Sequence, residues 1–236
     1  MARLTRAESQ AHTRRRLLAT ATELFLHDGY SGASLERVAE EAGFSKGAVY
    51  SNFRNKDELC LAVLEEVRAE KAASADATLS RTDTLEELLA ALGVWAVRTG
   101  GDQEWIRLEA EYLLNCRRDP ELLARLAKSN AEIAQQVAEL LNTSARRLGV
   151  RLPMDAHEAA HALLSIILGL GLLRSADPAI GVESFTSVVR LLARSGAEVS
   201  VPEARAASPD SGGRHGSTQS GTYAPAAGAD PSAIRD

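Results

Sequence analysis

The sequence contains little cysteine, few aromatic residues and no long apolar run. Only Cys60 and Cys116 occur among 236 residues, and aromatic residues make up 4%. Two cysteines exclude a disulfide scaffold and a multi-cysteine zinc site, and they suit a reducing compartment. The longest apolar run, 162–173, is shorter than the roughly 20 residues of a membrane span, and no apolar N-terminal stretch predicts a signal peptide. We therefore expect a cytoplasmic protein without membrane contact.

The alternating, β-branched pattern of strands is also absent. Apolar residues instead recur at helical spacing, for example between Leu17 and Phe25. Helix starts are predicted after residues that can accept hydrogen bonds from the first backbone N–H groups: Ser34, Ser45, Asn55, Thr84, Asp119 and Asp155. Helix ends are predicted at glycines: Gly29, Gly43, Gly100, Gly101 and Gly149. The sequence therefore predicts an all-α fold.

The net charge of −5 is unevenly distributed along the chain. Residues 1–16 carry five arginines against one glutamate, which is typical of a nucleic-acid-binding arm but equally of a solvated helix start. The acidic remainder does not exclude DNA binding, because only the face presented to phosphate matters. Residues 197–236 hold four of the seven prolines and five of the seventeen glycines, which predicts a disordered tail.

The most informative segment is SLERVAEEAGFSKGAVYSNFRNK, residues 34–56, which predicts two short helices joined by a turn. A helix-turn-helix requires a small residue where its helices touch, and Ala39 satisfies this. It requires tolerance of positive φ in the turn, which Gly43 provides, and an apolar inner residue on the second helix, which Val49 provides. The outward face of that helix then carries Lys46, Ala48, Ser51 and Asn52, which can reach base edges or phosphates.

This segment resembles the TetR family of bacterial transcriptional regulators, over about residues 10–62. The resemblance is carried by Phe25, Gly29, Tyr30, Ser34, Val38, Ala39, Ala42, Gly43, Ser45, Lys46, Gly47, Val49, Tyr50, Asn52, Phe53 and residues 55–59. It implies a DNA-binding domain at 1–60 with a three-helix head and a helical ligand-binding and dimerisation domain at 61–196. It also implies a homodimer on a palindromic double-stranded DNA operator, usually a repressor released by a small-molecule effector.

The resemblance also implies which residues contact DNA. Lys46, Gly47 and Ala48 fall where family members approach bases. Tyr50, Ser51 and Asn52 fall at phosphate or base contacts, although many members have histidine in place of Asn52. The remaining predicted DNA-binding residues are Ser34, Ser45 and Lys56. A phosphate contact at Lys56 is also expected from electrostatics. A capped helix N-terminus carries partial positive charge, and the lysine adds a full positive charge.

Residues 157–161 read His-Glu-Ala-Ala-His, which matches the H-E-x-x-H spacing of zinc peptidases. On a helix this spacing places His157 and His161 on one face, with Glu158 as general base. Glu158 is equally explained as the partner of Asp155 in a helix cap, and no strand is predicted that could hold a peptide. We therefore favour two surface histidines over a metal-sensing site or a metal-dependent hydrolase, and we expect no enzyme activity and no cofactor.

A ligand pocket is predicted from one helical stripe and a facing aromatic residue. Trp105, Glu109, Tyr112 and Cys116 follow at i, i+4, i+7 and i+11, and Trp95 on the preceding helix could face them. Aromatic rings beside a carboxylate suit a cationic or amphipathic aromatic ligand. The alternative is that the aromatic residues are simply core and that Glu109 lies at its rim.

The last two predicted helices are candidates for a dimer interface. The stretch 163–173 is apolar nearly all round and includes Gly169 and Gly171, so it must be buried on most sides. The helix at 182–195 adds further apolar residues at helical spacing. An intrachain core is the alternative for both. For the function, the alternatives to a ligand-released repressor are a transcriptional activator and a regulator without a ligand.

Overall fold

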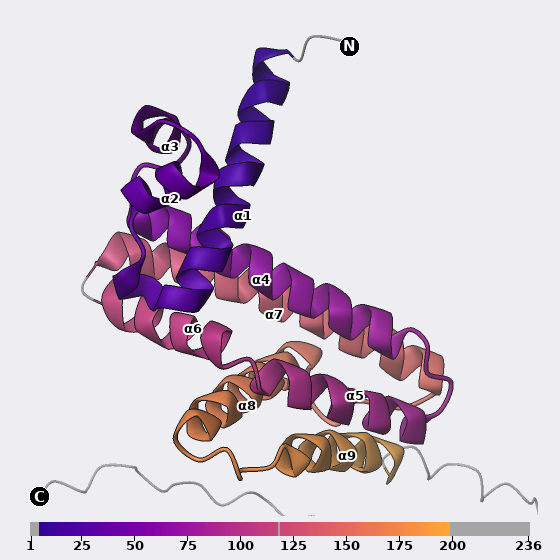
Figure 1. The fold of residues 1–236 in the computed structure, drawn as a ribbon. Coiled ribbons are helices and arrows are strands. Elements are labelled where there is room, and N and C mark those ends of the chain that lie inside the picture. Colours follow the sequence, from indigo (N-terminus) through magenta and orange to yellow (C-terminus); the bar gives the residue numbers. More distant parts are fainter. Residues whose placement is uncertain (1–4, 118, 199–236) are drawn as a thin grey trace, which may run out of the picture. The chain divides into compact units, whose positions relative to one another are not determined.

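The computed structural model describes residues 5–117 and 119–198, and it folds them into nine α-helices with no strand in that part of the chain (Figure 1). The helices are α1 (Arg6–Gly32), α2 (Leu35–Ala42), α3 (Lys46–Asn52), α4 (Lys56–Leu79), α5 (Leu85–Gly100), α6 (Gln103–Cys116), α7 (Pro120–Leu148), α8 (Ala156–Ala176) and α9 (Glu183–Glu198). The all-α prediction is confirmed. Residues 199–236, nearly all of the predicted tail, lie outside the described residues.

Six helix starts follow the predicted caps, whereas α1 and α6 are capped by Thr5 and Asp102, which are not among the predicted caps. Ser34 Oγ accepts from the Arg37 backbone N–H at 3.2 Å. Thr84 and Glu87 form a reciprocal capping box, in which each side chain accepts from the other residue's backbone N–H. Asn55 caps α4, but Glu58 reaches back to the backbone N–H of Arg54 at 3.1 Å instead of that of Asn55. Asn55 and Glu58 therefore do not form a reciprocal capping box, because the Glu58 side chain bonds one residue earlier.

Two glycines provide backbone conformations that the fold requires. Gly43, between α2 and α3, has φ 73° and ψ 32°, the left-handed conformation predicted for the turn. Gly29 has φ 76° and interrupts the helical backbone near the end of α1. A Cβ on Gly29 would lie 2.7 Å from Glu111 Oε2, so this position also permits the close approach of α6.

Two large hydrophobic clusters and a small one of Ala138, Ala156 and Ala160 organise the described helices. The first contains the inner faces of α1–α3 and the start of α4, and it continues into α6 and the first turns of α7 through Leu108, Tyr112 and Leu126. The second joins α5, α8 and α9, with Ile167 and Phe185 among its buried residues. The first cluster therefore extends across the predicted boundary at residues 60 and 61, which lies inside α4.

Helix α8 is longer than the apolar run identified in the sequence. The apolar run alone is too short for a membrane span, but the whole 21-residue helix is long and apolar enough by length and composition. It packs within the bundle against α5, α6 and α7. Only 28% of its most apolar stretch is buried inside the chain, however, and Leu172 and Leu173 are more than half exposed. An apolar strip of α8 is therefore left uncovered by this chain.

Candidate functional site

Helices α2 and α3 form a helix-turn-helix whose inner faces are buried. Val38, Val49 and Phe53 are fully buried, and Ala39 is 2% exposed where the two helices meet. This packing fixes the register of α3 and directs its opposite face to solvent, where Lys46 is exposed. Ser45 caps α3 by accepting from the Ala48 backbone N–H at 3.2 Å. The roles predicted for Ala39, Gly43 and Val49 in the motif agree with this arrangement.

The arginines of the basic N-terminal segment divide into two kinds. Arg14 donates to the Asn52 carbonyl at 2.6 Å, and its guanidinium lies 4.1 Å from the centre of the Phe53 ring. Arg16 donates to the Ala42 carbonyl at 3.3 Å. Arg15 is exposed. The number of arginines in the sequence could not separate the two kinds. Only the structure shows that Arg14 and Arg16 hold α1 against the ends of α3 and α2.

The predicted DNA-contacting side chains differ in how much they are engaged within the chain. Tyr50 is 50% exposed, and its hydroxyl donates to Glu36 Oε1 at 3.1 Å. Ser51 and Asn52 both donate to the Ala48 carbonyl, at 2.9 and 2.8 Å. Lys46 makes no hydrogen bond or ion pair within the described residues. On α2, a hydrogen bond from its own backbone N–H lowers the pKa of Glu36, and the charge of Lys46 on the exposed face of α3 helps to lower it without direct contact.

Lys56 begins α4 and is held near the end of α1. Its ammonium nitrogen lies 4.4 Å from the centre of the Tyr30 ring and donates to the Ser31 carbonyl at 3.4 Å. The side chain is half-buried beside the N-terminus of α4. It contributes a positive charge where the first backbone N–H groups of that helix already attract anions.

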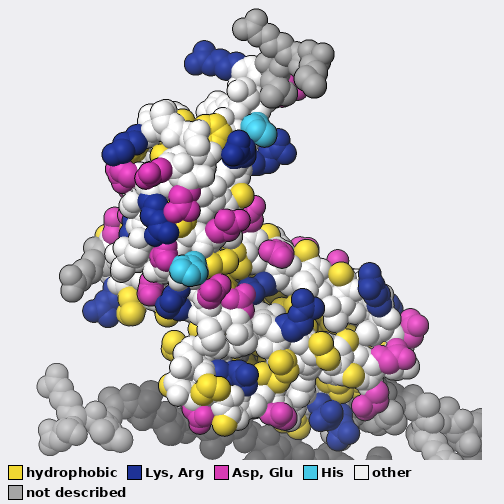
Figure 2. Space-filling view, in the orientation of Figure 1, with side chains coloured by type: hydrophobic (Ala, Val, Ile, Leu, Met, Phe, Trp, Pro, Cys, Tyr) yellow, Lys and Arg dark blue, Asp and Glu magenta, His cyan; other side chains and the backbone are white. Residues whose placement is uncertain are grey.

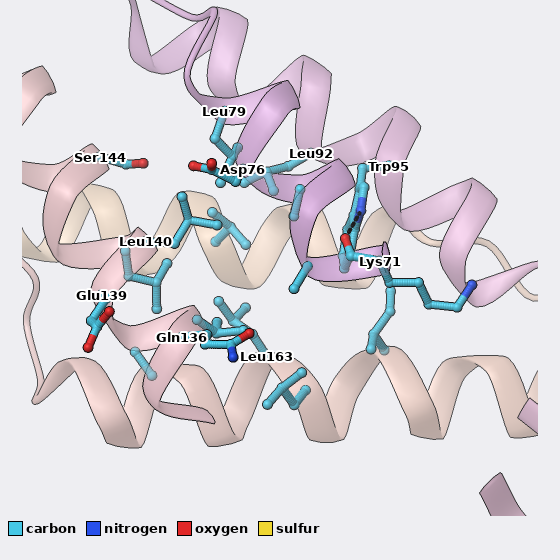
Figure 3. A pocket seen from close by; sticks show the side chains of 18 of the residues that line it. Lys71, Asp76, Leu79, Leu92, Trp95, Gln136, Glu139, Leu140, Ser144 and Leu163 are labelled. Atoms are coloured by element: carbon cyan, nitrogen blue, oxygen red, sulfur yellow. Dashed lines mark hydrogen bonds between the residues drawn. The ribbon is translucent and has the colours of Figure 1, made fainter. Parts of the chain in front are cut away.

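A cavity of about 550 Å³ lies among α4, α5, α7, α8 and α9 and reaches the start of α6 (Figure 3). Its walls are mostly apolar, and its size is in the range of small-molecule sites. The aliphatic residues that line it include Leu79, Leu88, Leu92, Leu140, Leu163 and Ile167. The sequence indicates the helices that supply these walls through their apolar spacing, but it does not indicate that their packing leaves a space between them.

Both tryptophans line this cavity, as the sequence interpretation expected of Trp95 and Trp105. The indole N–H of Trp95 donates to the Lys71 carbonyl at 3.4 Å, the dashed line in Figure 3. The indole N–H of Trp105 donates to Glu109 Oε1 at 3.0 Å, and Lys71 Nζ lies 4.6 Å from its ring centre. Since both N–H groups already have partners, the tryptophans contribute ring surface.

The other three predicted ligand residues do not line the cavity, and this part of the interpretation is corrected. Glu109 forms an ion pair with Arg68, with N–O distances of 2.6 and 2.5 Å. Tyr112 and Cys116 are fully buried in the first hydrophobic cluster. They share a helical face with Trp105, but eleven residues of helix advance about 16 Å along the axis. The stripe thus leaves the cavity and enters the core beneath the helix-turn-helix.

The C-terminal half of α6 is bonded to the DNA-binding head. Asp57 Oδ1 accepts from the Tyr30 hydroxyl at 2.6 Å and from Asn115 Nδ2 at 2.9 Å. Glu111 accepts from the Tyr30 backbone N–H at 2.7 Å. Burial, together with the hydrogen bond to Asp57, raises the pKa of Tyr30, so its hydroxyl remains a donor at neutral pH. Helix α6 therefore connects Trp105 at the cavity to the start of α4.

His157 and His161 are exposed on α8, with ring centres 6.1 Å apart. His157 Nε2 is hydrogen-bonded to Gln135 Oε1. Within residues 5–117 and 119–198, no group of three or more His, Cys, Asp or Glu side chains is arranged to hold a metal ion. The H-E-x-x-H spacing is thus present on a helix without a third protein ligand beside it in the described residues.

Residues 17–63 match the family model described as bacterial regulatory proteins, tetR family. The chain is 45% identical over 64 residues to the HTH-type transcriptional regulator SrpR of Pseudomonas putida, a match covering 27% of this chain and 30% of that protein. It is 28% identical over 142 residues to the HTH-type transcriptional repressor Rv1474c of Mycobacterium tuberculosis, covering 60% of this chain and 71% of the relative. The higher identity therefore falls in the DNA-binding region.

The structural similarity extends beyond that region. A transcriptional regulator from Rhodococcus sp. RHA1 aligns with a TM-score of 0.65 at 20% identity, covering 77% of this chain and 95% of that one. At this identity the likeness concerns the fold alone.

Proposed function

Because this chain is a TetR-family transcriptional regulator, we propose that it is a dimeric repressor which a small molecule releases from a palindromic operator. The observation that carries this proposal is the path through α6, from Trp105 at the cavity to Asn115 at the DNA-binding head. The relative from M. tuberculosis is named a repressor. The family is a class of regulators, not enzymes, so the H-E-x-x-H segment is assigned no catalytic role.

The DNA-binding domain in this proposal comprises residues 1–60, and the ligand-binding and dimerisation domain comprises residues 61–196. Helix α3 enters the major groove, where its exposed side chains meet base edges and the neighbouring residues meet phosphates. The proposed contact residues are Ser34, Ser45, Lys46, Gly47, Ala48, Tyr50, Ser51, Asn52 and Lys56. The protein acts in the cytoplasm, where the DNA of a bacterial cell is accessible.

The proposed homodimer forms through α8 and α9. Leu172 and Leu173 on α8 are 53% and 57% exposed, and pairing with a second copy would remove them from water. Figure 2 shows hydrophobic side chains gathered over the region of α5, α8 and α9. Two heads held by such an interface can enter successive major grooves only if they lie about 34–36 Å apart.

In this proposal the ligand-bound dimer and the operator-bound dimer hold their two DNA-binding heads at different separations, and this difference causes release. A ligand among α4, α5, α7 and α8 presses on the Trp105 end of α6, and the Asn115–Asp57 hydrogen bond transmits the displacement to α4. The ligand then lowers the affinity for the operator, and the operator lowers the affinity for the ligand by the same factor, because linkage is reciprocal.

The proposal is tested by selecting genomic DNA fragments with the purified protein and measuring affinity against salt concentration. Lys56→Ala should weaken binding to all sequences alike and lower the salt slope by roughly 0.9 per subunit. Lys46→Ala should also reduce discrimination between operator variants if its ammonium reaches a base.

Lys128→Ala is the matched control, since Lys128 is 80% exposed on α7 and lies outside the proposed DNA contacts. Its salt slope should equal that of the unmodified protein. Failure to retain any specific fragment would contradict the proposed DNA-binding function. A changed sequence preference with an unchanged slope for Lys56→Ala would contradict the assignment of Lys56 to phosphate.

A further inference from the structure

The polar residues around the cavity distinguish between ligand charges. We propose that the cavity takes a cationic amphiphile, an apolar body carrying one ammonium-type group, an inference that rests on the proposed effector role of the cavity. Its apolar part lies among the leucines and tryptophans, and its positive group lies at Asp76 and Glu139.

The basic groups of the cavity wall are already neutralised. Arg68 is paired with Glu109, and both side chains are about nine-tenths buried. Its Nη1 also donates to Ser129 Oγ at 3.1 Å. Lys71 Nζ is 2.7 Å from Asp102 Oδ2. An anionic headgroup that displaced Glu109 from Arg68 would leave a buried carboxylate without its partner, which is costly.

Two further carboxylates line the cavity and, unlike the Arg68–Glu109 pair, belong to solvent-exposed residues. Asp76 on α4 and Glu139 on α7 both line the cavity (Figure 3), and neither forms an ion pair within the described part of the chain. Glu139 accepts only from the side-chain amide of Gln135, at 2.7 Å. The nearby Arg147 is not among the lining residues, and its guanidinium donates to the carbonyls of Leu79 and Ser80. A ligand cation placed here would gain a partly screened attraction to both carboxylates.

A buried hydroxyl adds a second acceptor beside Asp76. Ser144 on α7 is 8% exposed, lines the cavity and makes no side-chain hydrogen bond within the described residues. In Figure 3 its oxygen and the carboxylate of Asp76 point toward each other. An ammonium group has three N–H donors, so it can donate to both oxygens at once. A carboxylate headgroup could accept from the Ser144 hydroxyl but would face the like charge of Asp76.

The length of the ligand follows from the spacing along α4. Arg68 and Asp76 are eight residues apart, roughly 12 Å along the helix axis. The wall between these polar ends is apolar and includes the ring face of Trp95. A ten-carbon chain matches this span, so decylamine, 1-decanol and decanoate form a test series that shares the ten-carbon skeleton and differs in the headgroup.

The experiment is a titration of the full-length protein, free of DNA, with each of the three compounds at pH 7. The chain has two tryptophans and both line the cavity, so its intrinsic fluorescence reports on this site. Decylamine is protonated at this pH. We expect it to bind about tenfold more tightly than decanoate, with decanol between them.

The double variant Asp76→Asn/Glu139→Gln should weaken decylamine about tenfold and leave decanol within about twofold. Glu132→Gln is the matched control, because Glu132 lies two turns before Glu139 on α7 but outside the cavity lining. It should leave all three affinities unchanged. Decanoate binding as tightly as decylamine, an unchanged preference in the double variant, or no binding by any of the three would overturn the proposal.

Operator affinity, measured separately, distinguishes this inference from the function on which it rests. Decylamine binding without any loss of operator affinity would support the cationic ligand class and contradict release by ligand. Operator release by decanoate but not by decylamine would overturn the ligand class and support release.

Discussion

At the scale of single residues, Gly43 determines the geometry of the helix-turn-helix. Its φ of 73° is strained for any residue with a Cβ, although an added Cβ would meet nothing within 4 Å. We expect Gly43→Ala to lower the free energy of unfolding by about 1 kcal/mol, through backbone strain alone. Urea denaturation at a fixed protein concentration measures this change.

Gly47→Ala is the control for Gly43→Ala, because Gly47 lies in α3 without a positive φ. It should have no destabilising effect and should stabilise the protein by up to about 1 kcal/mol, since alanine favours helix more than glycine does. Equal destabilisation by both substitutions would contradict the special role of the backbone at Gly43.

The ion pair of Arg68 and Glu109 gives a second prediction at this scale. Their side chains are 9% and 10% exposed, so removing one charge leaves the other buried without a partner. We expect Glu109→Gln to lower the free energy of unfolding by about 3 kcal/mol. Replacing both residues by apolar ones, Arg68→Met/Glu109→Leu, should recover most of that loss.

An exposed ion pair on α7 provides the comparison. Lys128 and Glu132 lie 3.8 Å apart with side chains 80% and 60% exposed, so Glu132→Gln should change stability by less than about 0.5 kcal/mol. The same melting temperature for Glu109→Gln and Glu132→Gln would show that the buried pair is not structural.

At the scale of elements, α6 is the link between the cavity and the head. Tyr30→Phe removes the hydroxyl that donates to Asp57 at 2.6 Å and accepts from Asn115 at 3.0 Å. We expect a loss of about 1–2 kcal/mol in stability. With decylamine as the effector, we expect decylamine to lower the operator affinity of this variant less than that of the unmodified protein. The affinity of the DNA-free protein for decylamine should stay the same.

Tyr50→Phe is the matched substitution on an exposed tyrosine, which donates to Glu36 on the surface. It should leave the unfolding free energy within about 0.5 kcal/mol and leave the ligand effect intact. A full ligand effect in Tyr30→Phe would exclude this hydrogen-bond network as the connection.

At the scale of the whole molecule, the uncovered strip of α8 predicts assembly. Replacing Leu172 and Leu173 together by glutamate should give a monomer in sedimentation analysis. Operator affinity should fall by about a hundredfold or more, because two linked half-site contacts become one. The same change at Leu113 and Leu114 on α6, which are 51% and 62% exposed, should leave the dimer unchanged. A dimer in the α8 variant would place the interface elsewhere.

The local features of this protein could be predicted from its sequence. The caps at Ser34, Ser45 and Thr84 and the positive φ of Gly43 depend on residues within four positions of one another. The inner face of the helix-turn-helix follows from helical spacing for the same reason. Sequence alone therefore determined the helical class, most of the element boundaries and the identification of the DNA-reading motif.

Only the tertiary structure decided which polar groups are available to a ligand. Glu109 was a plausible ligand residue on its own helix, but Arg68, 41 positions away, neutralises it. Asp76 and Glu139 are unremarkable in the sequence and reach the cavity because α4 and α7 pack together. The physical reason is that burial and charge pairing are properties of neighbours in space, and helical periodicity specifies only which side of a helix faces inward.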